Sequence, residues 1–296
     1  MLDHAPRLTW VTPPALPVDR LVVGRNIEEA SAILPRVFNL CRGAQETAAR
    51  LAFGKPLVEG ADDALHAEIL RDHVMMLAIR LPRHFGGVAQ ALPSGWQSDP
   101  ALLRPILLGD LYRMPDEAFA LARALTAREG VFRLLAQVRD SFLPGEAASD
   151  VLPVPEGAES LEIRPFENSV AGRWADHPMM RAVERDYGRG PFWRVLGRVV
   201  ELEALISGYR LGFRATPADE AFVAAARGTY AVRAKTDRGV VKAFHRVTPT
   251  DHLLAPGGVM EQSLARLPDQ KRGLGPLLLD ILDPCVPLKL QEVQDA

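Results

Sequence analysis

Apolar residues recur every three or four positions along much of the chain, which is the spacing that places side chains on one face of an α-helix. The first such segment spans 27–51, and Gly54 with Pro56 gives a helix-stop signal after it. Its apolar face carries Ala30, Leu34, Val37, Cys41, Ala44, Ala48 and Leu51. The same spacing predicts helices over 61–81, 100–111, 116–140 and, with interruptions, 169–209.

The pattern changes near residue 228. Two short runs of strand-forming residues, 228–234 and 240–247, flank Thr-Asp-Arg-Gly at 236–239, which predicts a β-hairpin. Two short helices are expected over 259–267 and 276–282. The second should end before Pro284, because the residue before a proline disfavours the helical conformation. Cys285 is therefore expected on extended chain just past a helix end.

Prolines and small residues mark the irregular segments. Four prolines within the first 20 residues predict an extended arm. The stretch 141–159, rich in Pro, Gly, Ala and acidic residues, predicts a connecting loop and is the only plausible internal boundary. We therefore expect one domain over residues 1–296, mainly α with a small β-hairpin near the C-terminus (α+β).

Composition and charge exclude several classes of function. Lys and Arg number 35 against 37 Asp and Glu, a net charge of -2, so no nucleic-acid partner is expected. No apolar run approaches the ~18 residues of a membrane span, so no membrane insertion is expected. The N-terminus lacks the cationic start and apolar stretch of a secretory signal, which favours a cytoplasmic location. Motifs of nucleotide-binding loops and of serine hydrolases are absent from the sequence.

Two cysteines, Cys41 and Cys285, lie 244 positions apart. Two are too few for a disulfide scaffold, an all-cysteine zinc site or an iron–sulfur cluster, and by composition alone they are most simply buried thiols. Cys41 is followed by Arg42 and Gly43, as in a caspase, but only His4 precedes it, so a cysteine protease is not expected.

Two histidines and a run of arginines can each be interpreted as structural or as functional residues. His66 and His73 lie seven residues apart on one predicted helix and could bind a metal, but they are more simply helix-face residues with local partners. Several arginines fall at helical spacing and predict either a solvated face with ion pairs or a docking surface. They are Arg181, Arg185, Arg189, Arg194 and Arg198.

Short motifs follow one another along residues 22–288. They are Leu-Cys-Arg-Gly at 40–43, the helical segment 68–82, Glu-Asn-Ser-Val-Ala-Gly-Arg at 167–173 with Asp-His-Pro at 176–178, Arg-Gly at 227–228, Thr-Pro-Thr at 248–250 and Asp-Pro-Cys at 283–285. In order and placement they resemble the large subunit of nickel–iron hydrogenases, in a shortened form. In that family a Cys-x-x-Cys follows the first long segment and an Asp-Pro-Cys-x-x-Cys closes the chain. The resemblance implies that family's fold.

The departures from the family pattern are informative. In the family, the first cysteine of each pair binds nickel terminally and the second bridges nickel and iron. Cys41 and Cys285 match the first cysteines, whereas Ala44 and Leu288 occupy the bridging positions. Two thiolates cannot hold the binuclear site, so we expect no nickel and no enzyme activity. His252 and Leu253 stand where the family has Trp and Asn.

This pattern resembles the HupK/HoxV-type hydrogenase maturation proteins. That resemblance implies a non-catalytic scaffold on which the Fe(CN)2CO fragment is held before delivery to the large subunit. Arg227 matches the family arginine near the diatomic ligands, and Pro249 with Thr250 matches the segment whose hydroxyl hydrogen-bonds a cyanide. Arg42 is a further candidate donor because it lies beside Cys41. The two cysteines match nickel positions, so either their side chains turn toward the iron or the iron binds displaced.

The resemblance also implies partners. They are a chaperone of the HypC type, the iron-assembly protein HypD and the apo large subunit. The alternative is a metal-free interaction module that mimics the large subunit and recruits maturation factors. If the scaffold hypothesis is right, Cys41 and Cys285 should meet in the fold, and the resemblance further implies that Arg227 is buried.

Overall fold

The computed structural model describes residues 7–14, 16–37, 40–109, 115, 117–217 and 219–293. The elements of the first half are β1 (Arg7–Val11), α1 (Val18–Val22), α2 (Ile27–Val37), α3 (Arg42–Ala52), α4 (Ala61–Met75), the π-helical turn η1 (Met76–Arg80), α5 (Leu81–Arg83), the 3-10 turn η2 (Pro100–Leu103), α6 (Arg104–Leu108), α7 (Ala118–Ala127) and α8 (Gly130–Ser141). Those of the second half are the 3-10 turn η3 (Gly157–Leu161), α9 (Val170–Arg173), α10 (Pro178–Tyr187), α11 (Pro191–Ile206), β2 (Phe213–Thr216), β3 (Glu220–Ala225), β4 (Gly228–Asp237), β5 (Val240–Val247), α12 (Pro249–Leu253), α13 (Val259–Ala265), the 3-10 turn η4 (Asp269–Leu274), α14 (Gly275–Leu282) and β6 (Lys289–Val293).

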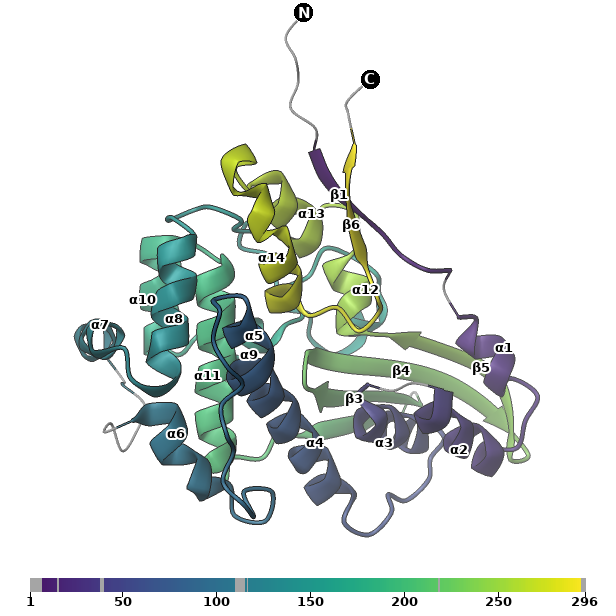
Figure 1. The fold of residues 1–296 in the computed structure, drawn as a ribbon. Helices are drawn as coiled ribbons and strands as arrows, with labels where there is room; N and C mark the ends of the chain where they lie inside the picture. Colours follow the sequence, from purple (N-terminus) through teal and green to yellow (C-terminus); the bar gives the residue numbers. More distant parts are fainter. Residues whose placement is uncertain are drawn as a thin grey trace, which may run out of the picture.

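Helix α11 forms the centre of the helical part. It contacts α4, α8, α9, α10 and α14 (Figure 1). Helices α4 and α8 each bury only part of their residues, whereas α11 is buried almost all round. A helix that is surrounded in this way can present its polar side chains only to partners inside the protein. Two of those polar side chains, Arg198 and Glu201, lie in the candidate site described below.

The second part is an antiparallel sheet in the order β2-β3-β4-β5, with α3 packed on β3 and β4 (Figure 1). The predicted hairpin is confirmed as β4 and β5. Strands β2 and β3 were not predicted, because every residue of β3 is buried and a short apolar run does not show the alternation of a half-exposed strand. The confirmed architecture is mainly helical with small antiparallel sheets.

The two ends of the chain pair with each other. Strand β1 runs antiparallel to β6, from Arg7 opposite Val293 to Val11 opposite Lys289. The predicted extended arm is thus partly a strand, and its remainder includes α1. Only residues 286–288 separate Cys285 from β6. The pairing therefore fixes the C-terminal segment close to that cysteine.

Several predicted helices are divided. The segment 27–51 breaks into α2 and α3, and Cys41 stands at the N-cap of α3 with a left-handed φ of 52°. The interpretation of Cys41 as part of a continuous helical stripe is therefore wrong. The segment 116–140 divides at Arg128, which also has a left-handed φ. The predicted helix over 61–81 is confirmed, with a π-helical turn in its last part. Residues 110–111 and 116 of two predicted helices lie outside the described residues.

The segment 141–159 has the predicted loop character and ends in η3. Among the described residues, no helix is long and apolar enough to cross a membrane.

Candidate functional site

The thiols of Cys41 and Cys285 meet at the junction of the helical part and the sheet. The Cys41 thiol hydrogen-bonds the Cys285 sulfur, and both cysteines are free and partly exposed. One precedes α3 and the other follows α14, so the fold brings together residues that lie 244 positions apart.

Two left-handed residues shape the turns that carry the thiols. Cys41 itself has a φ of 52°, and Asp283, the C-cap of α14, has a φ of 49°. Such a conformation is sterically unfavourable for residues other than glycine and is best tolerated by Asp and Asn. The backbone N–H of Cys285 donates to Thr250 Oγ1 at 2.7 Å, and that hydroxyl also hydrogen-bonds the Cys285 sulfur. Thr250 therefore orients Cys285.

Arg227 connects the two cysteine segments. It is 6 % exposed, as the resemblance implied, and it immediately precedes β4. Its guanidinium donates to Cys41 Sγ at 3.6 Å and to the carbonyl oxygen of Asp283 at 3.1 Å. A further bond of 3.3 Å reaches Oδ1 of Asp72 on α4. A guanidinium has five N–H donors in a fixed plane, so one side chain can hold three chain segments in register.

The environment gives the two thiols different acidities. The hydrogen bond from Cys41, the charge of Arg227 and the Thr250 hydroxyl lower the pKa of Cys285 against the effect of burial. The same hydrogen bond and burial raise the pKa of Cys41. The pair thus favours a thiolate at Cys285 with the shared proton on Cys41. A thiolate is the form of cysteine that binds metals.

A network of buried charged side chains adjoins the residues that hold the thiols. Glu201 on α11 accepts hydrogen bonds from Arg173 at 2.8 and 2.9 Å and from Trp174 at 2.7 Å, and it lies 2.8 Å from His73 Nε2. Burial raises the pKa of Glu201, but Arg173 and His73 outweigh it and bring the pKa to about 2. Arg198 donates to the other ring nitrogen of His73 at 3.3 Å. The partners of His73 are thus distant in sequence, and the expectation of local partners is wrong for this residue.

The run of arginines is not a single solvated face. Arg181 and Arg185 are exposed and paired with neighbouring aspartates, as predicted. Arg189, Arg194 and Arg198 are buried and can serve as neither a solvated face nor a docking surface. The expectation fails because α10 ends at Tyr187 and α11 begins at Pro191, which turns the later arginines inward.

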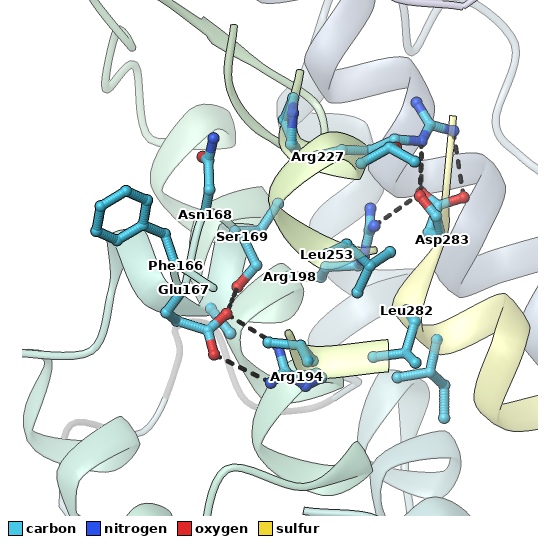
Figure 2. Close-up of a pocket in the computed structure, with 16 residues that line it drawn as sticks. Phe166, Glu167, Asn168, Ser169, Arg194, Arg198, Arg227, Leu253, Leu282 and Asp283 are labelled. Carbon is cyan, nitrogen blue, oxygen red and sulfur yellow. Dashed lines mark hydrogen bonds and ion pairs between the residues drawn. The ribbon is translucent and has the colours of Figure 1, made fainter. Parts of the chain in front are cut away.

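The remaining candidates fall into two groups. Pro249 and Thr250 line a cavity together with Arg194, Arg198, Arg227 and Asp283. Figure 2 shows Arg227 and Asp283 at one end of this cavity and Glu167 with Arg194 at the other. Arg42 is exposed and lines a separate pocket that contains Cys41. Arg227 is a lining residue of both pockets.

His252 is a structural residue. Its Nδ1 lies 2.9 Å from Asn168 Nδ2 and its Nε2 lies 2.9 Å from the Glu162 carbonyl oxygen. The Asn168 amide donates to Nδ1, and Nε2 donates to the Glu162 carbonyl oxygen. One ring nitrogen is thus an acceptor and the other a donor, so the ring is neutral. It therefore ties α12 to the segment before α9.

Most of the charged partners in the site could not be recognised from the sequence. Asp72 and Glu201 have no sequence signal that marks them as partners of the site. Asp283 was noted only as part of a motif. In the described part of the chain, no group of three or more His, Cys, Asp and Glu side chains is placed to hold a metal ion. A metal bound at the two thiols would therefore have to bring further ligands of its own.

Comparison with known proteins identifies the family of this chain. No model of a protein family matches it. The chain is 45% identical over 288 residues to the hydrogenase expression/formation protein HupK of Rhodobacter capsulatus, which covers 97% of this chain and 94% of that protein. The chain belongs to the HupK family.

Solved structures show which fold this HupK-family chain adopts. It superposes on the Ni-Fe-Se hydrogenase of D. vulgaris Hildenborough with a TM-score of 0.58 and 13% identity, over 92% of each chain. The NAD+-reducing [NiFe]-hydrogenase matches with a TM-score of 0.52 and 13% identity, over 95% of this chain and 99% of that chain. The predicted hydrogenase large-subunit fold is thus confirmed, and identity at this level indicates the fold alone.

Proposed function

We propose that this chain acts in the maturation of nickel–iron hydrogenases as a non-catalytic scaffold. It holds the Fe(CN)2CO fragment on Cys41 and Cys285 and passes it to the large subunit. The observation that supports this most directly is the meeting of two thiols from opposite ends of the chain, next to a buried arginine.

The donor set suits an iron that carries ligands of its own. Two cyanides and one carbonyl fill three of six positions, two thiolates anchor the iron, and one position stays open. Thiolates are the soft donors that such iron favours. A bare ion would need more protein ligands than the described residues offer around the thiols. Two anchors also permit release, which a scaffold requires.

Charge at the site agrees with this cargo. Fe(II) with two cyanides and two thiolates has a formal charge of −2, and burial of such a group requires hydrogen bonds and opposite charge. Arg227 supplies both at Cys41. Cyanide nitrogens accept hydrogen bonds, so guanidinium and hydroxyl groups are suitable neighbours.

The residues at the bridging positions argue against catalysis. Ala44 is fully buried within α3 and has no donor atom for a metal. Leu288 takes the other bridging position and packs against the apolar core. Without bridging thiolates the site accepts one metal fragment and not a nickel–iron pair.

The partners follow from this role. A chaperone of the HypC type and HypD would supply the fragment, and the apo large subunit would receive it. The alternative function is a metal-free module, favoured by the retention of the hydrogenase fold over nearly the whole chain. In that case the chain would recruit the same factors by shape.

Infrared spectroscopy tests the proposal. Protein purified without oxygen from cells that produce hydrogenase should show stretching bands of bound CO and cyanide. Cys41→Ser and Cys285→Ser should each abolish them, whereas Arg181→Ala, at an exposed ion pair on α10, should not. Bands that persist in both serine variants would refute the proposal. Iron-free protein that still binds the maturation factors would support the metal-free module instead.

A further inference from the structure

The two pockets that flank Arg227 differ in their access to the thiols. The cavity of Figure 2 is lined by Pro249 and Thr250, and neither cysteine is among its lining residues. The second pocket, which we call the thiol pocket, is lined by one of the two cysteines, Cys41, and by Arg42, Glu68, Arg71, Asp72 and Arg227 among others. An iron bound to the thiols can therefore turn its diatomic ligands toward either side of Arg227.

The hydroxyl on the first side is already in use. Thr250 Oγ1 accepts from the Cys285 backbone at 2.7 Å, and the same hydroxyl hydrogen-bonds the Cys285 sulfur. A hydroxyl has a single proton to donate. Thr250 would have to leave the Cys285 sulfur in order to donate to a cyanide.

Cations outnumber carboxylates among the side chains that line the thiol pocket, although Arg227 is also paired with Asp283 outside it. Three arginines line it against the two carboxylates Glu68 and Asp72. Asp72 is already held by Arg227 at 3.3 Å, and Glu68 Oε2 accepts the Gly43 N–H at 2.9 Å. The pocket encloses about 460 Å³ of empty space, part of it open to solvent. A water molecule in the liquid takes about 30 Å³, so several small ligands fit.

Arg71 is the uncommitted cation of this pocket. Its side chain is exposed, and within the described part of the chain no acceptor lies in hydrogen-bond reach of it. Arg71 and Glu68 also line a neighbouring groove whose walls include Ala64 and Trp96. Arg71 thus stands where this groove meets the thiol pocket, and positive charge at the mouth of a pocket attracts an anion.

We infer that the thiol pocket is the binding site for the anionic, cyanide-bearing iron fragment, and that Arg71 donates to one of its cyanide nitrogens. The inference rests on the proposed function and assigns the side of Arg227 on which the fragment lies. The iron then binds displaced toward α4, on the solvent side of the thiols. Arg71 acts as the specificity-determining residue because its hydrogen bond and its charge favour an anionic ligand that carries cyanide over one that does not.

The test compares two substitutions on the two sides of Arg227. Arg71→Ala and Thr250→Val are produced in hydrogenase-making cells and purified without oxygen, with wild type, Arg71→Lys and the surface control Arg181→Ala. Iron per protein after gel filtration and the positions of the cyanide bands are measured. Loss of one charge-assisted hydrogen bond should lower the iron retained by Arg71→Ala about tenfold. Arg71→Lys should retain most of the iron with shifted cyanide bands.

The outcomes separate the two proposals. This inference alone is overturned if Arg71→Ala keeps the wild-type iron content and cyanide bands. Shifted bands in Thr250→Val would then place the fragment in the other cavity. A wild-type protein without any CO or cyanide bands would overturn the proposed function and this inference together. Because Arg71 is exposed, its substitution should leave thermal unfolding unchanged, which excludes misfolding as the cause of iron loss.

Discussion

Arg198 donates a 2.7 Å hydrogen bond to Oδ2 of Asp283 and thereby joins the middle of α11 to the end of α14. Arg227 and Arg80 bond Oδ1 of the same carboxylate at 3.2 and 3.1 Å. Asp283 is 3 % exposed. Burial raises its pKa, but the three arginines outweigh burial and lower it. Three guanidinium groups thus share one buried carboxylate two residues before Cys285.

Loss of that carboxylate charge should destabilise the fold strongly. Asp283→Asn removes the buried carboxylate that the three arginines share and leaves them only the more exposed Asp72 and Asp280, so we expect the free energy of unfolding to fall by about 3–5 kcal/mol. Asp280→Asn is the matched control, since Asp280 also bonds Arg80 but is partly exposed, and it should cost about 1 kcal/mol or less. Urea unfolding at neutral pH measures both. Equal losses would show that Asp283 has no special role.

The hydrogen-bonded thiols should form a disulfide under mild oxidation. The Cys285 thiolate attacks oxidised glutathione and releases one glutathione, and Cys41 then attacks the mixed disulfide, loses its proton and releases the second. We expect a protein lighter by two hydrogen atoms, without free thiols and restored by a thiol reductant. Mass spectrometry measures this. Cys41→Ser should stop at the mixed disulfide, and a stable glutathione adduct on the wild-type protein would contradict the prediction.

Local pattern was sufficient to predict some elements. Alternating residues identified β4 and β5, and an uninterrupted apolar period identified α4. The same apolar spacing gave a wrong prediction of a continuous helix at Cys41. Val37, Cys41 and Ala44 keep helical spacing although α2 and α3 are separate helices and Cys41 has a left-handed φ. Local pattern contains no signal for such a break.

The candidate site shows the same limit. Both cysteines were found because they belong to short motifs, which are local. The burial of Arg194 and Arg198 could not be predicted, because their partners Glu167 and Asp283 lie 27 and 85 residues away. Only the folded chain shows which charges are paired across such distances.

Glu201 should contribute stability that is lost in acid. Its pKa is about 2 in the fold against an ordinary value of 4.5, so the contribution is complete above pH 4.5 and disappears as the pH falls toward 2. The shift corresponds to about 3 kcal/mol. Glu201→Gln should be less stable at neutral pH and should lose less stability on acidification, followed by chemical unfolding between pH 5 and 2.5. Glu203→Gln is the matched control, because it removes a partly exposed carboxylate, paired with Arg104, from the same helix. A wild-type slope in Glu201→Gln would refute the prediction.

His252 should make stability fall on mild acidification. Burial lowers its pKa, so the unfolded chain binds a proton more readily than the fold, and stability is complete above about pH 6.5 and falls below it. His252→Gln loses one of two hydrogen bonds, which should cost about 1–3 kcal/mol at pH 7.5. The same variant should lose less stability than wild type between pH 7.5 and 5, as measured by thermal unfolding. His66, which is only half-buried on α4, also has a lowered pKa, so His66→Gln should remove a smaller part of the slope. If His252→Gln were as sensitive to pH as wild type, the neutral ring between Asn168 and Glu162 would not be the source of the effect.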